Sequence, residues 1–313
     1  MSLTLRCIYT NTEEIKHFIK YDKCNFKNLS IFEGGVYMRI EFLGTAGGVP
    51  SLHKSVSQHL DTIQRTGPAI YIHDLQLLID TSEDIFYQLR RSQIDDIKYG
   101  VYSHWHPDHT MGLRIWETLN YDFINKIPQS RKSKIYITKQ QVADFKKYFG
   151  HWDHLNYLSE LGVIEKEIVE NDSRIKINHA SIEWIQLAEE FAFGFYITSN
   201  AQRILIIPDE IKNYIPIAKI KEVDVAILPF GSNEVNPVTH ERIHEAGMLE
   251  ELGEVRFEES VELAYEINAK HTYFTHIEAT ESLNETQVME LEQQLKQSGL
   301  NATIAYDGLI IQT

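Results

Sequence analysis

The chain has 313 residues, a formal net charge of −15, 43% hydrophobic residues and 24% charged residues. These proportions are typical of a globular protein long enough to bury a large core. The acidic balance argues against nucleic acid as a partner, because non-specific binding to nucleic acid depends on cationic contacts. No apolar run approaches the roughly 20 residues that cross a bilayer, so we expect no membrane span.

The first 37 residues precede the part of the chain with a clear fold pattern. We expect residues 1–37 to form an N-terminal extension with a short helix at 12–21, and residues 38–313 to form the main domain. No basic segment followed by an apolar stretch occurs at the N-terminus, so no signal peptide is expected. Cys7 and Cys24, the chain's two cysteines, lie in this extension and are predicted to be free thiols in the cytoplasm.

Strand and helix patterns interleave along the rest of the chain. Alternation of apolar residues predicts a strand at 38–42, a hairpin at 69–73 and 75–80 after a loop at 51–66, and a strand at 97–102. Ser82 and Thr138 are predicted to cap helices that run to about Arg91 and Tyr148. The remaining strands are predicted at 135–137, 165–169, 179–185, 193–198, 203–207 and 223–228, and the remaining helices at 257–269 and 284–297. This order favours two sheets packed face to face with helices outside.

Residues 104–109 hold four side chains that bind metals, namely His104, His106, Asp108 and His109. They directly follow the strand predicted at 97–102, so this strand would deliver them into the next loop. Neutral imidazole and carboxylate together suit zinc, manganese or iron rather than calcium. The spacing therefore predicts a transition-metal site, with one ion held by two imidazoles and another by a carboxylate and an imidazole.

This His-x-His-x-Asp-His motif resembles the metal-binding motif of the metallo-β-lactamase superfamily. The resemblance spans about 38–313 and includes a Gly-rich turn and strand ends at 42–50, 77–81, 206–209, 274–276 and 305–309, the last of them similar to the family's closing strand. Within the family it is nearer to the branch of ribonuclease Z and the phosphonate-pathway cyclic phosphodiesterases. The resemblance implies an α/β fold, a four-layer αβ/βα sandwich of two mixed β-sheets flanked by helices.

The resemblance also implies two divalent transition metal ions, with zinc expected and manganese or iron as alternatives. His104 and His106 would hold the first ion, Asp108, His109 and His276 the second, and Asp209 would bridge them. A hydroxide held between the ions would be the nucleophile, and Asp108 would align it or take its proton. Asp80, at a strand end, would accept a hydrogen bond from a ligand imidazole and select its tautomer.

Two positions depart from the family pattern. The family places a third histidine on the first metal at a register that falls here on Ala188. Glu189 is the nearest replacement, either as a ligand or as a solvated surface acid, and the first site is therefore expected to be weak, absent or unusual. The family also places a proton-donating histidine where this chain has Glu254. Glu254 itself is a candidate catalytic residue. His240 and His244, four residues apart, would share a face if this segment is helical and could donate the proton instead.

The region 116–170 is rich in aromatic residues and is predicted to be an insertion that either caps the metal pocket or packs in the core. We expect a metal-dependent hydrolase acting on a small or cyclic phosphodiester, with a small anionic substrate as its partner. A ribonuclease Z-like nuclease, a lactonase or thioester hydrolase, and a non-catalytic binding protein with a degraded site are the alternatives. Relatives in this family often pair, so a homodimer is a further expectation.

Overall fold

The computed structural model describes residues 38–49, 63–200, 202–281 and 283–313. These belong to one compact unit, Tyr37–Thr313. The helix predicted at 12–21, both cysteines and most of the loop predicted at 51–66 lie outside the described residues. Among the described residues, no helix combines the length and the apolar character needed to cross a membrane.

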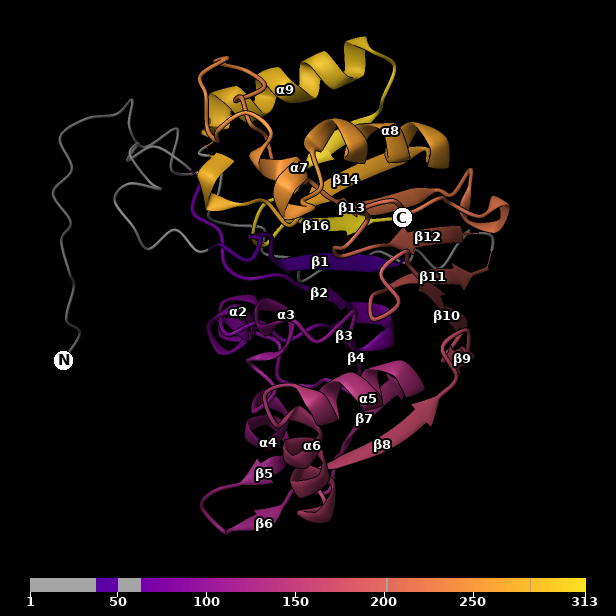
Figure 1. Cartoon of the computed structure of the whole chain (residues 1–313). Coiled ribbons are helices and arrows are strands. Elements are labelled where there is room, and N and C mark those ends of the chain that lie inside the picture. Colours follow the sequence, from indigo (N-terminus) through magenta and orange to yellow (C-terminus); the bar gives the residue numbers. More distant parts are fainter. Residues whose placement is uncertain (1–37, 50–62, 201, 282) are drawn as a thin grey trace, which may run out of the picture. The chain divides into compact units, whose positions relative to one another are not determined.

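Two sheets, each with seven strands, form the centre of this unit (Figure 1). In spatial order, the first sheet consists of β16 (Ile310–Gln312), β1 (Arg39–Gly44), β2 (Ala69–Ile72), β3 (Leu77–Ile79), β4 (Tyr99–Val101), β7 (Ser133–Thr138) and β8 (Ile164–Val169). Strands β16 to β3 pair antiparallel, whereas β3, β4, β7 and β8 run parallel. Region 116–170 thus contributes β7 and β8 to this sheet.

The second sheet has the same mixed character. In spatial order it consists of β15 (Ala302–Ile304), β14 (His271–Thr275), β13 (Val225–Pro229), β12 (Gln202–Ile206), β11 (Phe193–Ser199), β10 (Ala180–Gln186) and β9 (Arg174–Ile177). Strands β12 to β15 are parallel, and β9 to β12 are antiparallel. A separate pair, β5 (Tyr121–Asp122) and β6 (Ile127–Pro128), forms a short ribbon.

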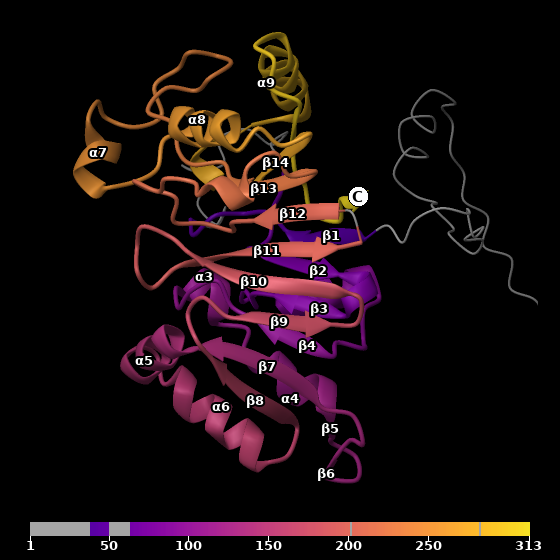
Figure 2. The same ribbon diagram turned by 90° about the vertical axis from the view of Figure 1, so that its right-hand side faces the viewer.

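Helices cover the outer face of each sheet (Figures 1 and 2). Beside the first sheet lie α2 (Ile85–Ser92), α3 (Pro107–Thr110), α4 (Ile115–Asn120), α5 (Lys139–Lys147) and α6 (His151–Glu160). Beside the second lie α7 (Met248–Leu252), α8 (Phe257–Ile267) and α9 (Glu285–Gln297). This arrangement of helices, sheet, sheet and helices is the four-layer sandwich expected from the sequence.

The alternation of side chains along the strands creates three separate cores. In β12, Ile204 and Ile206 face the other sheet, while Leu205 packs against α8 and α9. In β3, Leu77 and Ile79 join the core between the sheets, whereas Leu78 packs toward the helices of the first sheet. Successive strand residues point to opposite faces. A strand buried on both faces therefore reads as a continuous apolar run, as these strands do.

The parallel strands of both sheets end at the same edge, and this edge positions the site. Asp80 follows β3, His104 follows β4, Asp209 follows β12 and His276 follows β14. A backbone bridge between Ala46 and Ile277 joins the two sheets next to these strand ends. In open α/β sheets, ligands bind beyond the carboxyl ends of the strands, so this edge is the expected place for chemistry.

Two local predictions are wrong, and the helix that would have placed His240 and His244 on one face does not form. The N-cap of α2 is Asp84 rather than Ser82, whose hydroxyl is directed to Gln88 instead. Residues 305–309 are not a strand but the connection between β15 and β16, in which Asp307 accepts hydrogen bonds from Thr45 and Thr66. Residues 240–244 are not helical. There the Asn236 side chain accepts hydrogen bonds from the two backbone amides at 238 and 239, a turn that competes with a helix.

Candidate metal centre

The segment after β4 is shaped by a proline. Pro107 occupies the first turn of the short helix α3, and His106 is its N-cap residue. Proline is favoured at this position because its fixed φ suits a helix and its missing N–H would have no partner there. His104 and His106 consequently lie on the extended chain before the helix, while Asp108 and His109 lie in its first turn.

Three donor atoms from distant parts of the chain form a tight triangle. The Nε2 atoms of His109 and His276 are 3.3 Å apart, and each lies 3.2 Å from Oδ2 of Asp108. Ligand atoms about 2.0–2.1 Å from a tetrahedral metal are separated by about 3.3 Å. This group, which we call the second cluster, therefore has the spacing of a metal site (Asp108, His109 and His276).

A second group of donors lies beside the first. Its four donor atoms are all within 4.8 Å of one another, and they come from His104, His106, Asp209 and Glu210. Nδ1 of His106 is 3.3 Å from a carboxylate oxygen of Glu210. We call this group the first cluster. The structure thus brings together the residues that the sequence assigned to each ion and adds Glu210 to the first set.

Asp209 lies between the two clusters. Its Oδ2 is 3.9 Å from Nε2 of His104 in the first cluster. The same oxygen is 3.5 Å from Nε2 of His276 and 3.9 Å from Nε2 of His109 in the second. A carboxylate in this position can offer oxygen atoms to two ions, which is the bridging arrangement expected of this residue.

Asp80 orients the buried histidines through hydrogen bonds. Its Oδ2 accepts from Nδ1–H of His109 at 2.8 Å and from the Ser103 hydroxyl at 2.7 Å. The Ser103 hydroxyl lies 3.0 Å from Nδ1 of His104 and, because its own proton goes to Asp80, it accepts from that nitrogen. Both rings are thereby held with Nε2 directed at the clusters. Such outer partners select the tautomer that binds a metal.

Nε2 of His104 provides the test of whether these residues fit a metal. The residue is 1% exposed, and this nitrogen has no hydrogen-bond partner among the described residues. A buried polar atom without a partner costs free energy. A divalent ion bound by the first cluster would provide the missing partner, so the donor set fits the metal that the motif predicts.

The electrostatics of the clusters agree with this fit. Burial and the neighbouring rings of His109 and His106 hold the pKa of His104 well below its ordinary value, so its lone pair is available. Although burial opposes ionisation, His109 and His276 hold the pKa of Asp108 well below its usual range. Burial also acts against protonated His276, but Asp209 and Asp108 outweigh it and raise its pKa to about 9. Cations are thus strongly favoured here.

Glu210 is the residue that the sequence analysis missed. The structure places Ala188 and Glu189 in an exposed turn after β10, and Glu189 is not part of either cluster. Glu210 has a left-handed backbone with φ of 59°, which is uncommon for a residue other than glycine. The only sequence signal was its place directly after Asp209. Nothing in the sequence shows that the chain turns its side chain back toward His106.

The three candidates for proton delivery lie in different settings. His240 is exposed, with φ of 60°, and with His244 it lies in an irregular loop rather than on a helix. Glu254 is exposed. Loss of some hydration and the Asp209 carboxylate raise its pKa, whereas His276, His244 and Lys212 lower it to a lesser degree. Glu254 is thus electrostatically linked to one residue of each cluster, Asp209 and His276.

Aromatic rings surround the first cluster on one side. Trp105, between the two histidines of the motif, stacks on Tyr148 with ring centroids 3.8 Å apart. Phe191 lies 5.4 Å from the ring of His106. Phe149 is 58% exposed beside Trp105. Part of the aromatic region 116–170 therefore borders the site, in line with the predicted alternative that this region caps the metal pocket.

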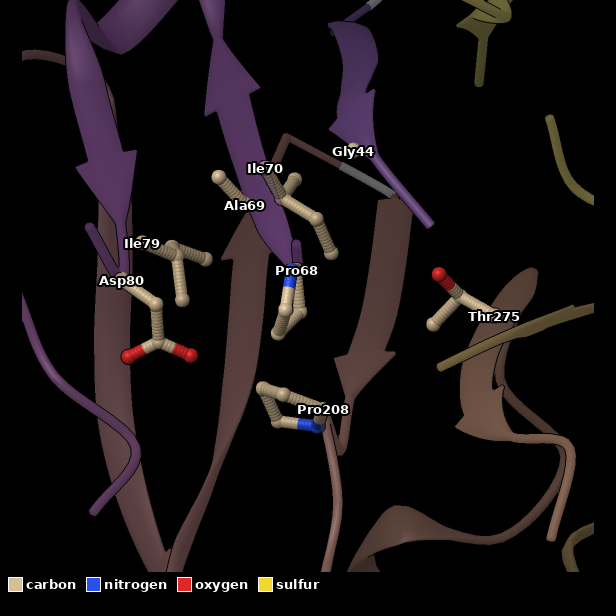
Figure 3. Close-up of a pocket in the computed structure, with 8 residues that line it drawn as sticks. All are labelled: Gly44, Pro68, Ala69, Ile70, Ile79, Asp80, Pro208 and Thr275. Carbon is tan, nitrogen blue, oxygen red and sulfur yellow. The ribbon is translucent and has the colours of Figure 1, made fainter. Parts of the chain in front are cut away.

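A cavity of about 10 Å³ lies next to the clusters and is lined by Gly44, Pro68, Ala69, Ile70, Ile79, Asp80, Pro208 and Thr275 (Figure 3). Pro68 and Pro208 lie between Asp80 and Thr275 in this view. Small-molecule sites enclose about 300–1,000 Å³. This cavity is hence a packing space under the strand ends, and a substrate must approach the metals from elsewhere.

Comparison with known proteins identifies the family. A sequence profile of the beta-lactamase superfamily domain matches residues 76–277, which is more than half of the chain. The chain belongs to the metallo-β-lactamase superfamily. Members of this superfamily are mostly metal-dependent hydrolases, and the two clusters have the composition of divalent metal sites. Comparison with curated protein sequences gave no match.

Solved structures share the metallo-β-lactamase fold. A diphosphatase from the PhnP family superposes with a TM-score of 0.61 and 21% identity over 89% of this chain and 98% of its own. Zinc-bound PqqB from Methylobacterium extorquens gives 0.63 and 17%, covering 87% and 99%. A long-form RNase Z from yeast gives 0.55 and 11%, covering 90% of this chain and 43% of its own. At these identities the similarity establishes the fold.

Proposed function

We propose that this chain is a metal-dependent phosphodiesterase that hydrolyses a small or cyclic phosphodiester. The observation that carries the proposal is the pair of adjacent donor clusters with Asp209 between them. Two divalent ions held there would supply a nucleophile at neutral pH, because a bound metal lowers the pKa of water. Paired ions are also suited to phosphoryl oxygens, which carry the negative charge of the substrate.

The structural relatives support phosphorus as the reacting atom. One is described as a diphosphatase and another as an RNase Z, and both names denote cleavage of a phosphorus–oxygen bond. Lactone and thioester hydrolysis use the same kind of nucleophile. The donor clusters alone would serve either kind of substrate, so the preference for phosphorus comes from these relatives.

Two carboxylates have distinct roles in the proposed reaction. Asp108 stays ionised, because His109 and His276 hold its pKa low. It can therefore accept a hydrogen bond from the attacking water and orient it, but so low a pKa makes it a weak base. Glu254 has a raised pKa, so it keeps a proton to a higher pH than an ordinary glutamate. We assign it the transfer of that proton to the leaving oxygen, the role that the family gives to a histidine.

The charges around the clusters favour a small substrate over structured RNA. Glu189 and Glu190 are exposed in the turn near the first cluster. The nearby cation Lys212 is engaged by Glu259 and Glu250. RNA binding needs several free cationic contacts to phosphates. A small anion needs only the metals themselves, which would dominate the field of the site.

The proposal is tested by assaying the protein, loaded separately with zinc, manganese and ferrous iron, on bis(p-nitrophenyl) phosphate, a cyclic nucleotide, a lactone and a structured RNA. We expect hydrolysis of the small phosphodiesters and at least about 10²-fold less with Asp108→Ala, the scale of a misplaced reacting group. Asp153→Ala, on the exposed side of α6, is the matched control. Absence of phosphodiester hydrolysis with all three metals would refute the proposal.

A further inference from the structure

The first cluster has to be completed by a residue other than the histidine of the family pattern. The position that would supply this histidine is Ala188, in an exposed turn. In this turn the carbonyl of Glu189 accepts a hydrogen bond from the amide of Ala192 at 2.9 Å, while the Glu189 side chain remains exposed. The turn therefore brings no donor atom of its own to the metal.

Glu210 reaches the same cluster from the segment after β12, in the same sheet as the turn at Ala188. Its side chain is only 22% exposed, and its carboxylate lies 3.3 Å from Nδ1 of His106. The left-handed backbone at φ 59° is unfavourable for a residue with a side chain. Such strain is retained where the surroundings require it, often at ligand sites. Here it directs a carboxylate into a group of donors rather than into solvent.

The unpartnered Nε2 of His104 independently marks the space in which the first cluster would hold an ion. Nε2 of His104 is buried and has no hydrogen-bond partner among the described residues, while Ser103 engages its Nδ1. This nitrogen is directed at the space that it shares with the donor atoms of His106, Asp209 and Glu210. Two imidazoles and two carboxylates thus converge on one place, which is enough for a four-coordinate ion.

We propose that Glu210 is a ligand of the first metal and replaces the histidine that the chain lacks at position 188. We further infer that this carboxylate shifts the metal preference of the site from zinc toward manganese or ferrous iron. Imidazole suits zinc and iron, whereas added carboxylate oxygen favours harder ions such as manganese. The inference rests on the metal binding that the proposed function requires, but not on hydrolysis.

The test measures metal binding directly on the full chain. Wild type and Glu210→Gln, Glu210→His, Glu189→Gln and Glu190→Gln are freed of metal and titrated with Mn²⁺ and with Zn²⁺ by calorimetry. We expect two ions per wild-type chain. Glu210→Gln keeps the size of the side chain and should lower Mn²⁺ affinity at one site by at least about 10-fold, the minimum seen even for partners outside the ligand set. Glu210→His should raise the ratio of Zn²⁺ to Mn²⁺ affinity at that site by about 10-fold or more.

Glu189→Gln and Glu190→Gln are the matched controls, because they neutralise carboxylates in the nearby exposed turn. Both should bind two ions with affinities within about 2-fold of wild type. Circular dichroism of the metal-free variants checks that each is folded. Electron paramagnetic resonance gives a second readout, since two Mn²⁺ ions that share Asp209 give a coupled spectrum and a single ion does not.

The inference is overturned when Glu210→Gln binds two ions as tightly as wild type, when Glu189→Gln loses an ion instead, or when the wild-type chain binds fewer than two. These results are separate from the fate of the proposed function. If Glu210→Gln loses one Mn²⁺ while the wild-type chain hydrolyses no phosphodiester, the ligand assignment is supported and the proposed substrate is refuted.

Discussion

Single residues set the state of the metal ligands through hydrogen bonds. Asp80 binds the Nδ1 side of His109 directly and that of His104 through Ser103. One carboxylate thus selects the tautomer of a ring in each cluster. Asp80 itself has φ of 63°, an uncommon backbone for aspartate. Asp80 thus acts from outside the two clusters, whereas Glu210 lies within the first cluster.

A second buried carboxylate, Glu281, makes stability depend on pH. It is fully buried and accepts hydrogen bonds from the backbone and side-chain amides of Asn233. Burial raises its pKa to about 7. The folded chain therefore binds this proton more tightly than the unfolded chain, and stability is lost as pH rises from about 4.5 to 7.

When the pH rises from 5 to 8, we expect the difference in unfolding free energy between Glu281→Gln and wild type to shift in favour of the variant by about 2–3 kcal/mol. Glutamine resembles the protonated acid in shape and charge, so it escapes the cost of ionisation. Urea denaturation of the metal-free proteins at both pH values measures the difference. Glu290→Gln, on the exposed face of α9, is the control. A difference between Glu281→Gln and wild type that does not change with pH would contradict this account.

At the residue scale, the sequence predicted ligands that lie in a contiguous motif or directly after an apolar strand. His104, His106, Asp108 and His109 are in one motif, and the structure brings them together with Asp209 and His276. It could not predict Glu210, because its role depends on a positive φ that the residue type does not favour. It predicted Glu189 from its distance along the chain, but that distance does not show that the turn is exposed.

Among the elements, α5 supports the start of the metal-binding segment. Thr138 caps this helix by accepting from the amide of Gln141 at 3.1 Å, and the Gln141 side chain accepts in return from the amide of Thr138. The side-chain Nε2 of Gln141 also donates to the backbone carbonyl groups of Tyr102 and Ser103. The cap that begins the helix thus also holds the chain just before His104.

We expect Thr138→Ala to lower the free energy of unfolding by about 1 kcal/mol relative to Thr138→Ser. Both variants lose the buried methyl group, and only alanine loses the hydroxyl that caps the helix, so the comparison isolates the cap. Chemical denaturation of the metal-free variants provides the measurement. Equal stability of the serine and alanine variants would show that the cap contributes nothing.

The elements that the sequence predicted best are those whose apolar pattern alone determines them. Strands β10 to β13 and helices α5, α8 and α9 lie within about two residues of their predicted bounds. The predictions were poorer where a side chain directs the backbone. Asp307 holds a turn where a strand was expected, and the Asn236 side chain forms a turn where a helix was considered. Such contacts involve partners that periodicity does not reveal.

On the scale of the whole molecule, the metal clusters join the two sheets. His104 to His109 follow β4 of the first sheet, whereas Asp209 and His276 follow β12 and β14 of the second. The donors from the two sheets meet with Asp108 and His276 only 3.2 Å apart. In the metal-free chain, several carboxylates and imidazoles crowd this junction, so an ion bound there would be a link between the halves of the sandwich.

This link predicts that metal ions stabilise the fold. Each ion that binds only the folded state at about 100 times its Kd contributes about 2.7 kcal/mol. Because each kcal/mol raises Tm by about 2–4 °C in domains of about 150–250 residues, we use about 2 °C for this larger unit. We expect saturating Mn²⁺ or Zn²⁺ to raise Tm by about 5–10 °C, and a chelator to reverse the shift. Scanning calorimetry with and without metal makes the measurement.

His276→Ala removes a donor of the second sheet and should lose much of the increase in Tm. His179 is an exposed histidine outside both clusters, so the control variant His179→Ala should keep the increase. A Tm that is the same with and without metal would mean that the donors do not link the sheets through an ion.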